Sequence, residues 1–365
     1  MVPLPFKFTP RLLENEMRKH RLTALILALC LLASSLASCE KKEEKFVEYS
    51  LDYFDTVTII TGYEKTKEEF DAVTEAALNL LREYHRLYTI YSSYDGLENL
   101  CTINKLYDGA HRVVTVDQRI IDMLLYAREA YDLTGGKLNI AMGSVLSVWH
   151  EYREKGLDDP KNAALPPMDT LEQAALHTDI DLVEINEENG TVTLLDPAMR
   201  LDVGAIAKGY AVEMIAQALE ANGTGSYVLN VGGNVRTVGS KPDGSPWLIG
   251  IENPDEYADD PYAEYISLAG ESVVTSGSYQ RYYFVDGKNY HHIIDPETLM
   301  PAEGYLSVSV ICKSSAEGDA LSTALFCMSL EEGLALIDSI EGAEAMWILS
   351  DGEKHYSKGF DTYIK

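Results

Sequence analysis

The spacing of apolar and polar residues predicts two long helices in the first half of the chain. Between Phe70 and Tyr91, apolar side chains recur every three or four positions, which is the spacing of one face of an amphipathic helix. A second helix is expected after Asp117, a good N-cap residue, and should end near residues 134–136, where two glycines follow a threonine. We interpret the apolar face of the first helix as core-facing rather than as part of a cofactor site.

Short apolar runs between turn-forming residues predict many strands. Residues 46–50 and 54–61 should form a pair, and the turn at residues 187–190 should join a hairpin of residues 180–185 and 191–195. Further strands are predicted at residues 227–231, 235–238, 247–251, 272–275 and 306–311, with another hairpin turn at Asp286-Gly287. We expect the strands at 247–251 and 272–275 to continue the sheet that contains 227–231.

The remaining patterns complete a mixed arrangement without internal repeats. Shorter helices are predicted at residues 170–176, from 206 to 222, through Met328, and at 331–340. Residues 135–149 are mostly small and apolar after two glycines, which indicates a wall lined by backbone. We therefore predict an α/β (mixed α+β) fold over residues 46–365, a single large domain of mixed sheets with flanking helices in two interlocked subdomains.

The N-terminus has the pattern of an export signal. Basic residues 18–21 precede an apolar run at residues 22–32, and Leu36-Ala37-Ser38-Cys39 follows in the pattern of a bacterial lipobox. We predict a signal peptide over residues 1–38, with translation starting at Met1 or Met17, and lipidation at Cys39. A plain signal peptide or a short anchor is the alternative, although the apolar run is short for a permanent membrane span. Residues 39–45 are expected to form a charged tether.

Charge and cysteine content narrow the classes of partner. The formal net charge of −28, from 30 basic and 58 acidic side chains, argues against nucleic acid or an anionic membrane surface as a partner. A bound polyphosphate would need a cation as mediator. Beyond the predicted signal and lipidation site, Cys101, Cys312 and Cys327 have no metal-ligand spacing, so we expect buried small apolar residues.

One glycine-rich stretch could bind a phosphate. In Leu201–Ala211, Asp202 precedes Gly204, Lys208 and Gly209 at the start of a predicted helix, whose free N–H groups attract anions. The same sequence is also common where a strand and a helix merely pack. The bend at Gly232-Gly233 is not a dinucleotide fingerprint, because no helix is predicted after it.

Two later segments carry side chains that could bind a metal ion or accept a proton. Asp319, Ser322 and Thr323 share one helix face and form a hard oxygen set suited to Mg²⁺, although Asp319 could instead be a helix N-cap. His292 lies at a predicted strand end, with His291 pointing to the opposite face, and could take a proton from a hydroxyl. A lone histidine at such a position is more often a packing or surface residue than a catalytic one.

Five separated motifs, in order along the chain, resemble the ApbE family of FAD:protein FMN transferases over roughly residues 46–365. They are Asp202-Val-Gly-Ala-Ile-Ala-Lys-Gly-Tyr-Ala, Asn230-Val-Gly-Gly-Asn, Thr275-Ser-Gly, His292-Ile-Ile-Asp-Pro-Glu-Thr and Asp319-Ala-Leu-Ser-Thr. The resemblance implies Mg²⁺ held by Asp319, Thr323 and the Ala205 carbonyl, with Ser322 close by. It implies FAD contacts from Phe54, Tyr94, Lys137, Leu138, Asn139, Asp202, Lys208 and Ile293.

The chain departs from the family pattern at three places. Phe54-Asp55-Thr56 replaces Met-Gly-Thr, Lys137-Leu138-Asn139 replaces Ala-Phe-Asp, and Thr298-Leu299-Met300-Pro301 lacks the glycine of Thr-Gly-x-Pro. The first two differences affect residues that the resemblance places against the flavin, whereas the metal and histidine motifs are intact.

The resemblance implies transfer of FMN from FAD to a threonine hydroxyl of an acceptor flavoprotein, with release of AMP. His292 is then expected to deprotonate the hydroxyl, and Asp319 to hold the metal at the reacting pyrophosphate. Two alternatives remain: a Mg²⁺-dependent FAD pyrophosphatase that gives FMN and AMP, and a lipoprotein that binds flavin without turnover. Lipidation would place the protein on the bacterial membrane, facing the periplasm or the cell exterior.

Overall fold

The computed structural model describes residues 42–365 of the chain. The predicted signal peptide, the two possible start codons and the lipidation site at Cys39 therefore lie outside the described residues. Within residues 42–365, no helix is long and apolar enough to cross a membrane. Lys45–Lys365 form one compact unit, as a single large domain requires.

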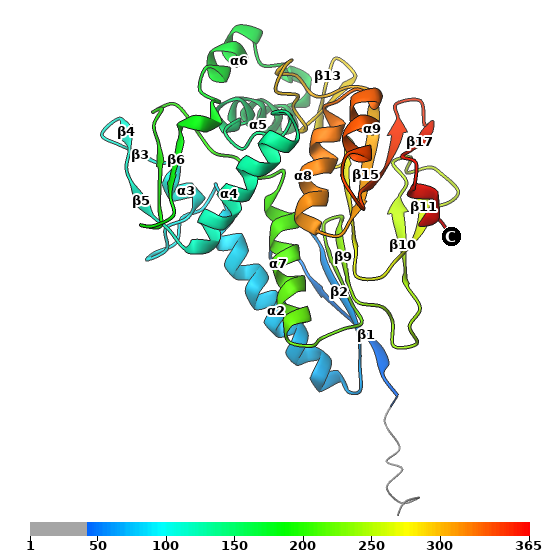
Figure 1. Cartoon of the computed structure of the whole chain (residues 1–365). Coiled ribbons are helices and arrows are strands. Elements are labelled where there is room, and N and C mark those ends of the chain that lie inside the picture. Colours follow the sequence, from blue (N-terminus) through cyan, green and yellow to red (C-terminus); the bar gives the residue numbers. More distant parts are fainter. Residues whose placement is uncertain (1–41) are drawn as a thin grey trace, which may run out of the picture. The chain divides into compact units, whose positions relative to one another are not determined.

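An eight-stranded sheet forms the centre of this unit (Figure 1). Its strands, in spatial order, are β1 (Glu44–Ser50), β2 (Thr58–Glu64), β8 (Tyr227–Val231), β9 (Asn234–Val238), β12 (Ser272–Gly277), β15 (Tyr305–Cys312), β16 (Glu344–Leu349) and β17 (Lys354–Tyr356). From β2 to β17 each neighbouring pair is antiparallel. The predicted mixed α/β fold is confirmed, and β2 begins four residues later than predicted because residues 54–57 form a turn.

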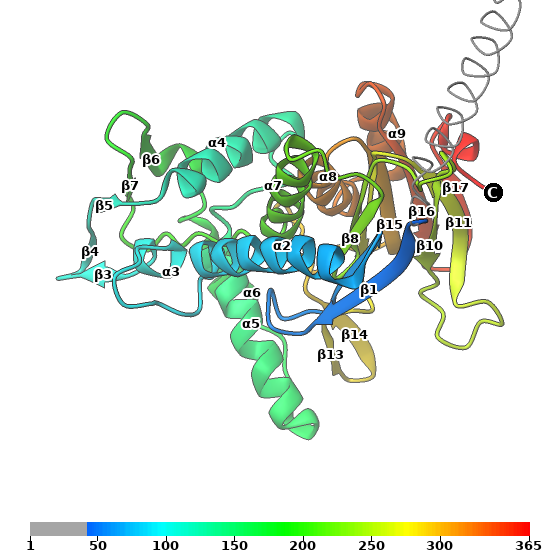
Figure 2. The same ribbon diagram turned by 90° about the horizontal axis from the view of Figure 1, so that it is seen from below.

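Three helices cover one face of the sheet: α2 (Lys67–Tyr88), α7 (Ala207–Ala221) and α8 (Ser315–Phe326) (Figures 1 and 2). The helices cover apolar side chains of the sheet, as β8 illustrates. Successive side chains of a strand point to opposite faces, so β8 contributes to a core on each face. Leu229 and Val231 belong to the core beneath α2 and α7, whereas Val228 belongs to a core on the other face.

The second core lies beneath a separate hairpin of β10 (Trp247–Glu252) and β11 (Tyr262–Leu268). The prediction that residues 247–251 continue the main sheet was wrong, since β10 pairs only with β11. Its buried residues Trp247 and Ile251 pack against the sheet face instead of joining its edge. Apolar spacing predicts that a segment is a strand, but it does not identify the neighbouring strand.

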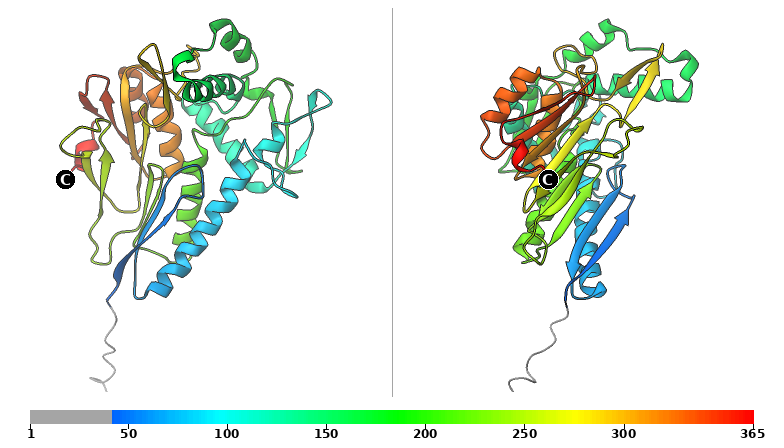
Figure 3. Two further views of the ribbon diagram at one scale, coloured as in Figure 1. Left: turned by 180° about the vertical axis from the view of Figure 1, so that it is seen from behind. Right: turned by 90° about the vertical axis from the view of Figure 1, so that its right-hand side faces the viewer.

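A second group of elements stands beside the main sheet (Figure 3). It consists of α4 (Gln118–Leu133), α5 (Gly143–Asp158), α6 (Met168–Ala175), the small sheet of β5 (Val114–Thr115), β7 (Thr191–Leu194) and β6 (Val183–Asn186), and the hairpin of β13 (Tyr282–Val285) and β14 (Lys288–His291). Short elements complete the unit: α3 (Leu100–Ile103), α9 (Leu330–Asp338), the pair β3 (Leu106–Tyr107) and β4 (Ala110–His111), and 3-10 turns at Pro160–Asn162, Ile180–Leu182 and Phe360–Thr362.

Helix α5 was not predicted, because its first half belongs to the small, apolar run that we interpreted as a backbone-lined wall. It packs with α6, β13 and the loop after β14 in a core that contains Val145, Trp149 and Leu299. This packing brings α5 next to the segment that carries His292.

Candidate active site

The start of α7 and the first turns of α8 touch at Gly209. A Cβ atom there would lie 2.3 Å from the Ser315 carbonyl oxygen and 2.4 Å from Cβ of Asp319, so only glycine permits this contact. The Gly209 N–H donates to Asp319 Oδ2 over 2.7 Å. The glycine-rich stretch at 201–211 and the predicted metal ligand therefore meet directly, although 110 residues separate them in sequence.

Asp319 is not the N-cap of its own helix. Ser314 caps α8 by accepting the Glu317 N–H, and Asp319 instead accepts an N–H from the first turn of α7. The capping alternative for α8 is thus wrong. Asp319 is buried, and burial raises the pKa of its carboxyl, while the positive charge of Lys208 and the Gly209 N–H oppose the shift.

Hydroxyl groups surround the same turn of α8. Ser276 Oγ lies 2.9 Å from Ser322 Oγ and 3.4 Å from Thr323 Oγ1, so the Thr275-Ser-Gly motif contacts this face of α8. Within residues 42–365 no group of three or more His, Cys, Asp or Glu side chains could hold a metal ion. A metal here would use one carboxylate with hydroxyl and carbonyl oxygens, a donor set that fits Mg²⁺ and does not fit zinc.

His292 follows β14 directly and is partly buried. Its Nδ1 is buried and has no hydrogen-bond partner among the described residues. Burial, followed by the positive charges of Arg281, His291, Lys208 and Arg153, lowers the pKa of His292 to about 3. The imidazole is therefore neutral at physiological pH.

His291 has a different environment, as the alternation along the strand predicts. Its Nε2 lies 2.8 Å from the Ala302 carbonyl oxygen, and its Nδ1 accepts the Ile293 N–H, which assigns the proton to Nε2. His291 therefore fixes the loop after β14, and His292 remains the histidine that is available for chemistry.

Asp202 belongs to the same cluster of charges. Its Oδ1 accepts the Gly204 N–H over 2.9 Å, and its backbone N–H donates to the Ile140 carbonyl. Burial raises the pKa of Asp202, while the Gly204 N–H and the charges of His150 and Arg281 oppose that rise. Arg281 and Lys208 also lower the pKa of His292, and Lys208 lowers that of Asp319, so electrostatic interactions link Asp202, Lys208, His292 and Asp319.

Ala205 lies at the turn before α7 and is half-buried, three residues before Lys208. The metal role of its carbonyl oxygen stays a prediction.

Four of the residues expected to contact the flavin form contacts within the protein: Lys137, Leu138, Asn139 and Ile293. Lys137 pairs with Asp295 at 3.2 Å and with Glu297 at 3.0 Å, and these hydrogen bonds raise the Lys137 pKa although burial lowers it. Leu138 and Ile293 lie in hydrophobic cores. Asn139 donates to the Thr178 carbonyl and accepts the Ala141 N–H. Lys137 is thus tied to the loop after His292, and a ligand contact from these four residues stays a prediction.

Phe54 and Tyr94 are both fixed by α2. The Phe54 N–H donates to His85 Nδ1 over 3.1 Å, and the Phe54 ring meets the His85 ring edge-on at 5.4 Å. The Arg86 guanidinium lies 4.5 Å from the centre of the Tyr94 ring. One face of Tyr94 is therefore covered, and only its other face is open to a flavin or adenine ring.

At two of the departures from the family pattern, the backbone has the left-handed conformation that glycine would favour. Asp55 has a φ of 51° and Leu299 a φ of 60°, both in the left-handed region, and each replaces a glycine of the family motifs. The loops thus retain their course, at the cost of strain in non-glycine residues.

The sequence analysis assigned no role to Arg153 and Arg281, whose charges act on His292, or to Ser276 and Asn234 beside α8. Ser276 and Asn234 lie within the quoted motifs, which was the available signal. Arg153 lies on the unpredicted helix α5.

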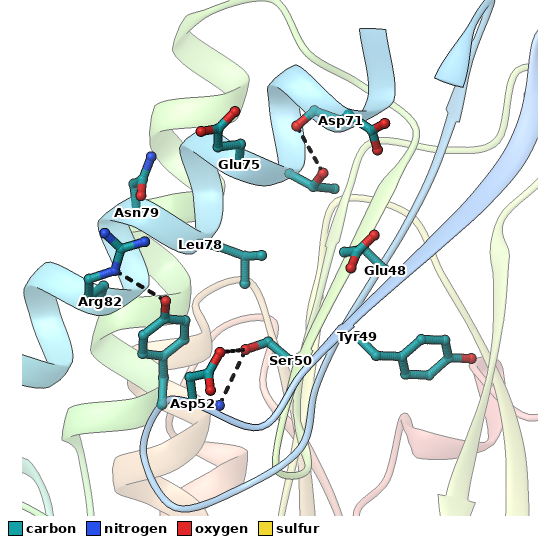
Figure 4. Close-up of a pocket in the computed structure, with 11 residues that line it drawn as sticks. Glu48, Tyr49, Ser50, Asp52, Asp71, Glu75, Leu78, Asn79 and Arg82 are labelled. Carbon is teal, nitrogen blue, oxygen red and sulfur yellow. Dashed lines mark hydrogen bonds between the residues drawn. The ribbon is translucent and has the colours of Figure 1, made fainter. Parts of the chain in front are cut away.

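A separate hollow of about 400 Å³ lies between β1 and the first half of α2 (Figure 4). Four carboxylates are among its lining residues: Glu48, Asp52, Asp71 and Glu75. None of the predicted site residues lines it. This acidic hollow is therefore distinct from the charge cluster around His292.

Comparisons with known proteins agree with the arrangement. The model of the ApbE family matches residues 54–347. A FAD:protein FMN transferase of Treponema pallidum is 34% identical over 266 residues, which cover 69% of this chain and 71% of the relative. The protein of that name from Haemophilus influenzae is 27% identical over 330 residues, covering 88% and 91% of the two chains.

The same fold occurs in solved structures. The crystal structure of the ApbE protein from Thermotoga maritima superposes with a TM-score of 0.74 at 28% identity, covering 89% of this chain and 100% of that one. The apo flavinyl transferase ApbE of Pseudomonas stutzeri gives a TM-score of 0.71 at 25% identity, covering 88% and 96%. The chain belongs to the ApbE family.

Proposed function

We propose that this protein is an FMN transferase that uses FAD as donor and a threonine hydroxyl of another protein as acceptor. The hydroxyl oxygen attacks the phosphorus on the riboflavin side of the pyrophosphate. The new bond is a phosphoester to the acceptor, and the bond to the AMP phosphate breaks, so that AMP leaves with the electron pair. Relatives of this chain are named FAD:protein FMN transferase, which supports FAD as the donor and an FMN-labelled protein as the product.

The observation that carries the proposal is the state of His292 beside Lys208 and Asp319. The hydroxyl proton needs an acceptor, and the unpartnered Nδ1 of His292 offers a lone pair for it. The pKa of His292 is far below 7 in the free protein, and the negative charge of a bound pyrophosphate would raise it toward the range of a useful base. Lys208 lowers the pKa of both His292 and Asp319, and its ammonium would oppose the negative charge of a bound pyrophosphate. In the first turn of α7, the Ala207 and Gly209 N–H groups already donate to the Val203 carbonyl and to Asp319, so the side chain of Lys208 is the contribution of this segment that we propose for the ligand.

Mg²⁺ is the cofactor that the oxygen donors of α8 fit. Asp319 and Thr323 would hold it, with Ser322 close by and the Ala205 carbonyl as a further ligand. When bound, the ion supplies positive charge to the pyrophosphate oxygens. Asp319 is suited to this role because it is a buried carboxylate without a salt bridge among residues 42–365.

The test is to incubate the protein with FAD, Mg²⁺ and a flavin-accepting domain, then to look for a fluorescent band on a denaturing gel. A labelled acceptor together with AMP is the expected result. AMP and free FMN without label would mean hydrolysis, and unchanged FAD would leave only flavin binding. An acceptor whose target threonine is replaced by alanine is the matched control, because it should remain unlabelled while FAD and metal are unchanged.

The location of the protein is part of the proposal. Lipidation of Cys39 would hold the Lys45–Lys365 unit on the outer side of a bacterial membrane, where its acceptors would also be exposed. The short apolar run followed by Leu-Ala-Ser-Cys supports this placement.

A further inference from the structure

The end of β12 lies against the turn of α8 that carries Thr323. Val274 and Ser276 are two residues apart in this strand, so their side chains point to the same face of the sheet. That face is the one that α8 covers, because a Cβ atom on Gly318 would lie 2.8 Å from Val274 Cγ2. Ser276 meets the next turn of α8, where its Oγ lies 2.9 Å from Ser322 Oγ and 3.4 Å from Thr323 Oγ1.

Ser276 also lies where the sheet becomes narrower. The register between β12 and β9 covers Ser272–Val274, whereas the register between β12 and β15 continues to Gly277. Ser276 and Thr323 are both half-buried, and Ser322 is fully buried. Ser322 therefore lies behind a surface to which Ser276 and Thr323 both contribute.

The hydroxyl protons of these three residues can be assigned from one carbonyl group. Ser322 Oγ donates to the backbone carbonyl of Asp319 over 3.2 Å, and a carbonyl oxygen can only accept. Because Ser322 has a single hydroxyl proton, the proton in its contact with Ser276 comes from Ser276. Ser276 has then used its own proton, so it accepts the proton of Thr323 in their contact.

This order of donors determines which way the Thr323 hydroxyl faces. Its proton points to Ser276, so the lone pairs of its oxygen are directed away from β12. A threonine hydroxyl binds a divalent cation through these lone pairs. The buried carboxylate of Asp319 lies four residues earlier and therefore on the same face of α8.

We propose that Ser276 is a positioning residue that orients the Thr323 hydroxyl for a divalent cation, and that Ser322 holds Ser276 without binding the cation. The proposal rests on the proposed function for the presence of the metal. Ser276 acts through Thr323 and takes no part in the making or breaking of a covalent bond. Without its oxygen, the Thr323 hydroxyl would lose its acceptor, and the cation would have to reorient it on binding.

The experiment measures equilibrium binding of Mn²⁺ to the full chain without FAD, with free Mn²⁺ read by electron paramagnetic resonance and Mg²⁺ as the competitor. Mn²⁺ suits the same oxygen ligands as Mg²⁺. Ser276→Val and Ser276→Thr introduce side chains of nearly the same shape, and only the second keeps the hydroxyl. Ser276→Val should weaken Mn²⁺ binding about fivefold, as expected for one neutral hydrogen bond, and Ser276→Thr should stay within about twofold of the wild type.

Thr275→Val is the matched control. Thr275 is the neighbouring residue in β12 and points to the opposite face, where its hydroxyl lies 2.8 Å from Ser309 Oγ. This variant also loses a hydroxyl contact in the same strand, but it should bind Mn²⁺ within about twofold of the wild type.

A double variant tests whether Ser276 acts through Thr323. Thr323→Val should weaken Mn²⁺ binding at least as much as Ser276→Val does. Adding Ser276→Val to Thr323→Val should change the affinity by less than about twofold, because the hydroxyl that Ser276 orients is already absent. Losses that multiply in the double variant would overturn the proposal.

Three further results would also overturn it: unchanged Mn²⁺ affinity in Ser276→Val, equal losses in Ser276→Val and Ser276→Thr, and a wild type that binds no Mn²⁺. Labelling of a flavin-accepting domain with FMN, measured in parallel on the wild type, separates this proposal from the proposed function. If Mn²⁺ binding depends on the Ser276 hydroxyl but no FMN is transferred, the transfer reaction is refuted and the positioning of Thr323 stands. If FMN is transferred while Ser276→Val binds Mn²⁺ like the wild type, the function stands and the positioning role is refuted.

Discussion

At the scale of single residues, the environment of His292 predicts how stability depends on pH. An ordinary histidine has a pKa of 6.5, and burial lowers that of His292 to about 3. Between these values the unfolded chain binds a proton that the folded protein does not, so this residue makes stability fall as the pH decreases from about 6.5. His292→Asn should therefore lose less stability than the wild type between pH 7 and pH 4.5.

Urea unfolding of both proteins at several pH values measures this difference, and parallel curves would show that His292 is not buried in its neutral form. His291→Asn is a poor substitute as a control, because His291 is itself buried and hydrogen-bonded to Ala302. His355→Asn, which replaces a half-buried histidine near the C-terminus, is the better control.

The two left-handed residues provide a second prediction at this scale. Leu299 is 8% exposed and packs in the core beside α5, whereas Asp55 is exposed. Leu299→Gly should lower the free energy of unfolding by about 1–2 kcal/mol, because the loss of buried apolar surface exceeds the relief of strain. Asp55→Gly relieves similar strain without losing a core contact and should leave stability unchanged or raise it.

Thermal unfolding of the two variants side by side checks this contrast. If neither variant is destabilised, backbone strain rather than side-chain burial decides the tolerance of these positions, and equal destabilisation would refute the expected relief of strain at Asp55. The comparison also explains how the chain can lack both family glycines and keep the loops next to the site.

At the scale of elements, α7 and α8 hold each other by reciprocal contacts. Asp319 on α8 accepts the Gly209 N–H at the start of α7, and Glu213 on α7 accepts the Ser315 N–H at the start of α8 over 2.8 Å. Each helix therefore receives its negative charge at the N-terminus from the other helix. This arrangement sets the distance between Lys208 and the oxygen groups of α8.

Gly209→Ala should disturb that arrangement directly. The added methyl would lie within 2.3 Å of the Ser315 carbonyl oxygen, so the helices must separate. We expect a loss of about 1–3 kcal/mol in stability, typical of overpacking, and a fall in FMN transfer of at least about tenfold. The matched control is Gly225→Ala, where nothing lies within 4 Å of the added atom. Transfer and unfolding curves that match the wild type for Gly209→Ala would contradict the close contact.

Glu213 has a second partner that makes it important for stability. It pairs with Arg236 at 3.1 Å, and the two side chains are 6% and 3% exposed. Glu213→Gln would leave a buried guanidinium with less negative charge beside it, so we expect a loss of about 3 kcal/mol or more. Glu220 pairs with the same arginine at 3.1 Å but is 42% exposed, so Glu220→Gln should cost less than about 1 kcal/mol. Urea unfolding that gives equal losses would refute the distinction.

The same elements show what the sequence could and could not predict. The helix from Phe70 and the helix capped by Asp117 follow from periodicity and capping, and both are confirmed. Helix α5 was missed because its first half follows two glycines in a run of mostly small and apolar residues, in which Ser144 and Ser147 do not give a clear amphipathic pattern. The motifs identified Asp319 and His292, but the contact through Gly209 depends on packing between distant segments.

At the scale of the whole molecule, charge is distributed unevenly. The chain has a net charge of −28, and four carboxylates are among the residues that line the hollow between β1 and α2, yet the positive charges of Lys208, Arg153 and Arg281 all lower the pKa of His292. An anionic ligand is repelled by most of the surface and attracted at this site. This contrast gives FAD one favourable position on an otherwise acidic protein.

The division between the N-terminal segment and the Lys45–Lys365 unit leads to a prediction about anchoring. Every residue that we place in the site belongs to that unit, so the membrane attachment should be dispensable for chemistry. Cys39→Ser should move the protein from the membrane fraction to the soluble fraction of cells, and transfer to a soluble acceptor should continue at the wild-type rate per molecule. Cys101→Ser is the control that should remain on the membrane. Retention of Cys39→Ser would favour an anchor formed by the apolar run at residues 22–32, because lipid on Cys39 would then be unnecessary for attachment.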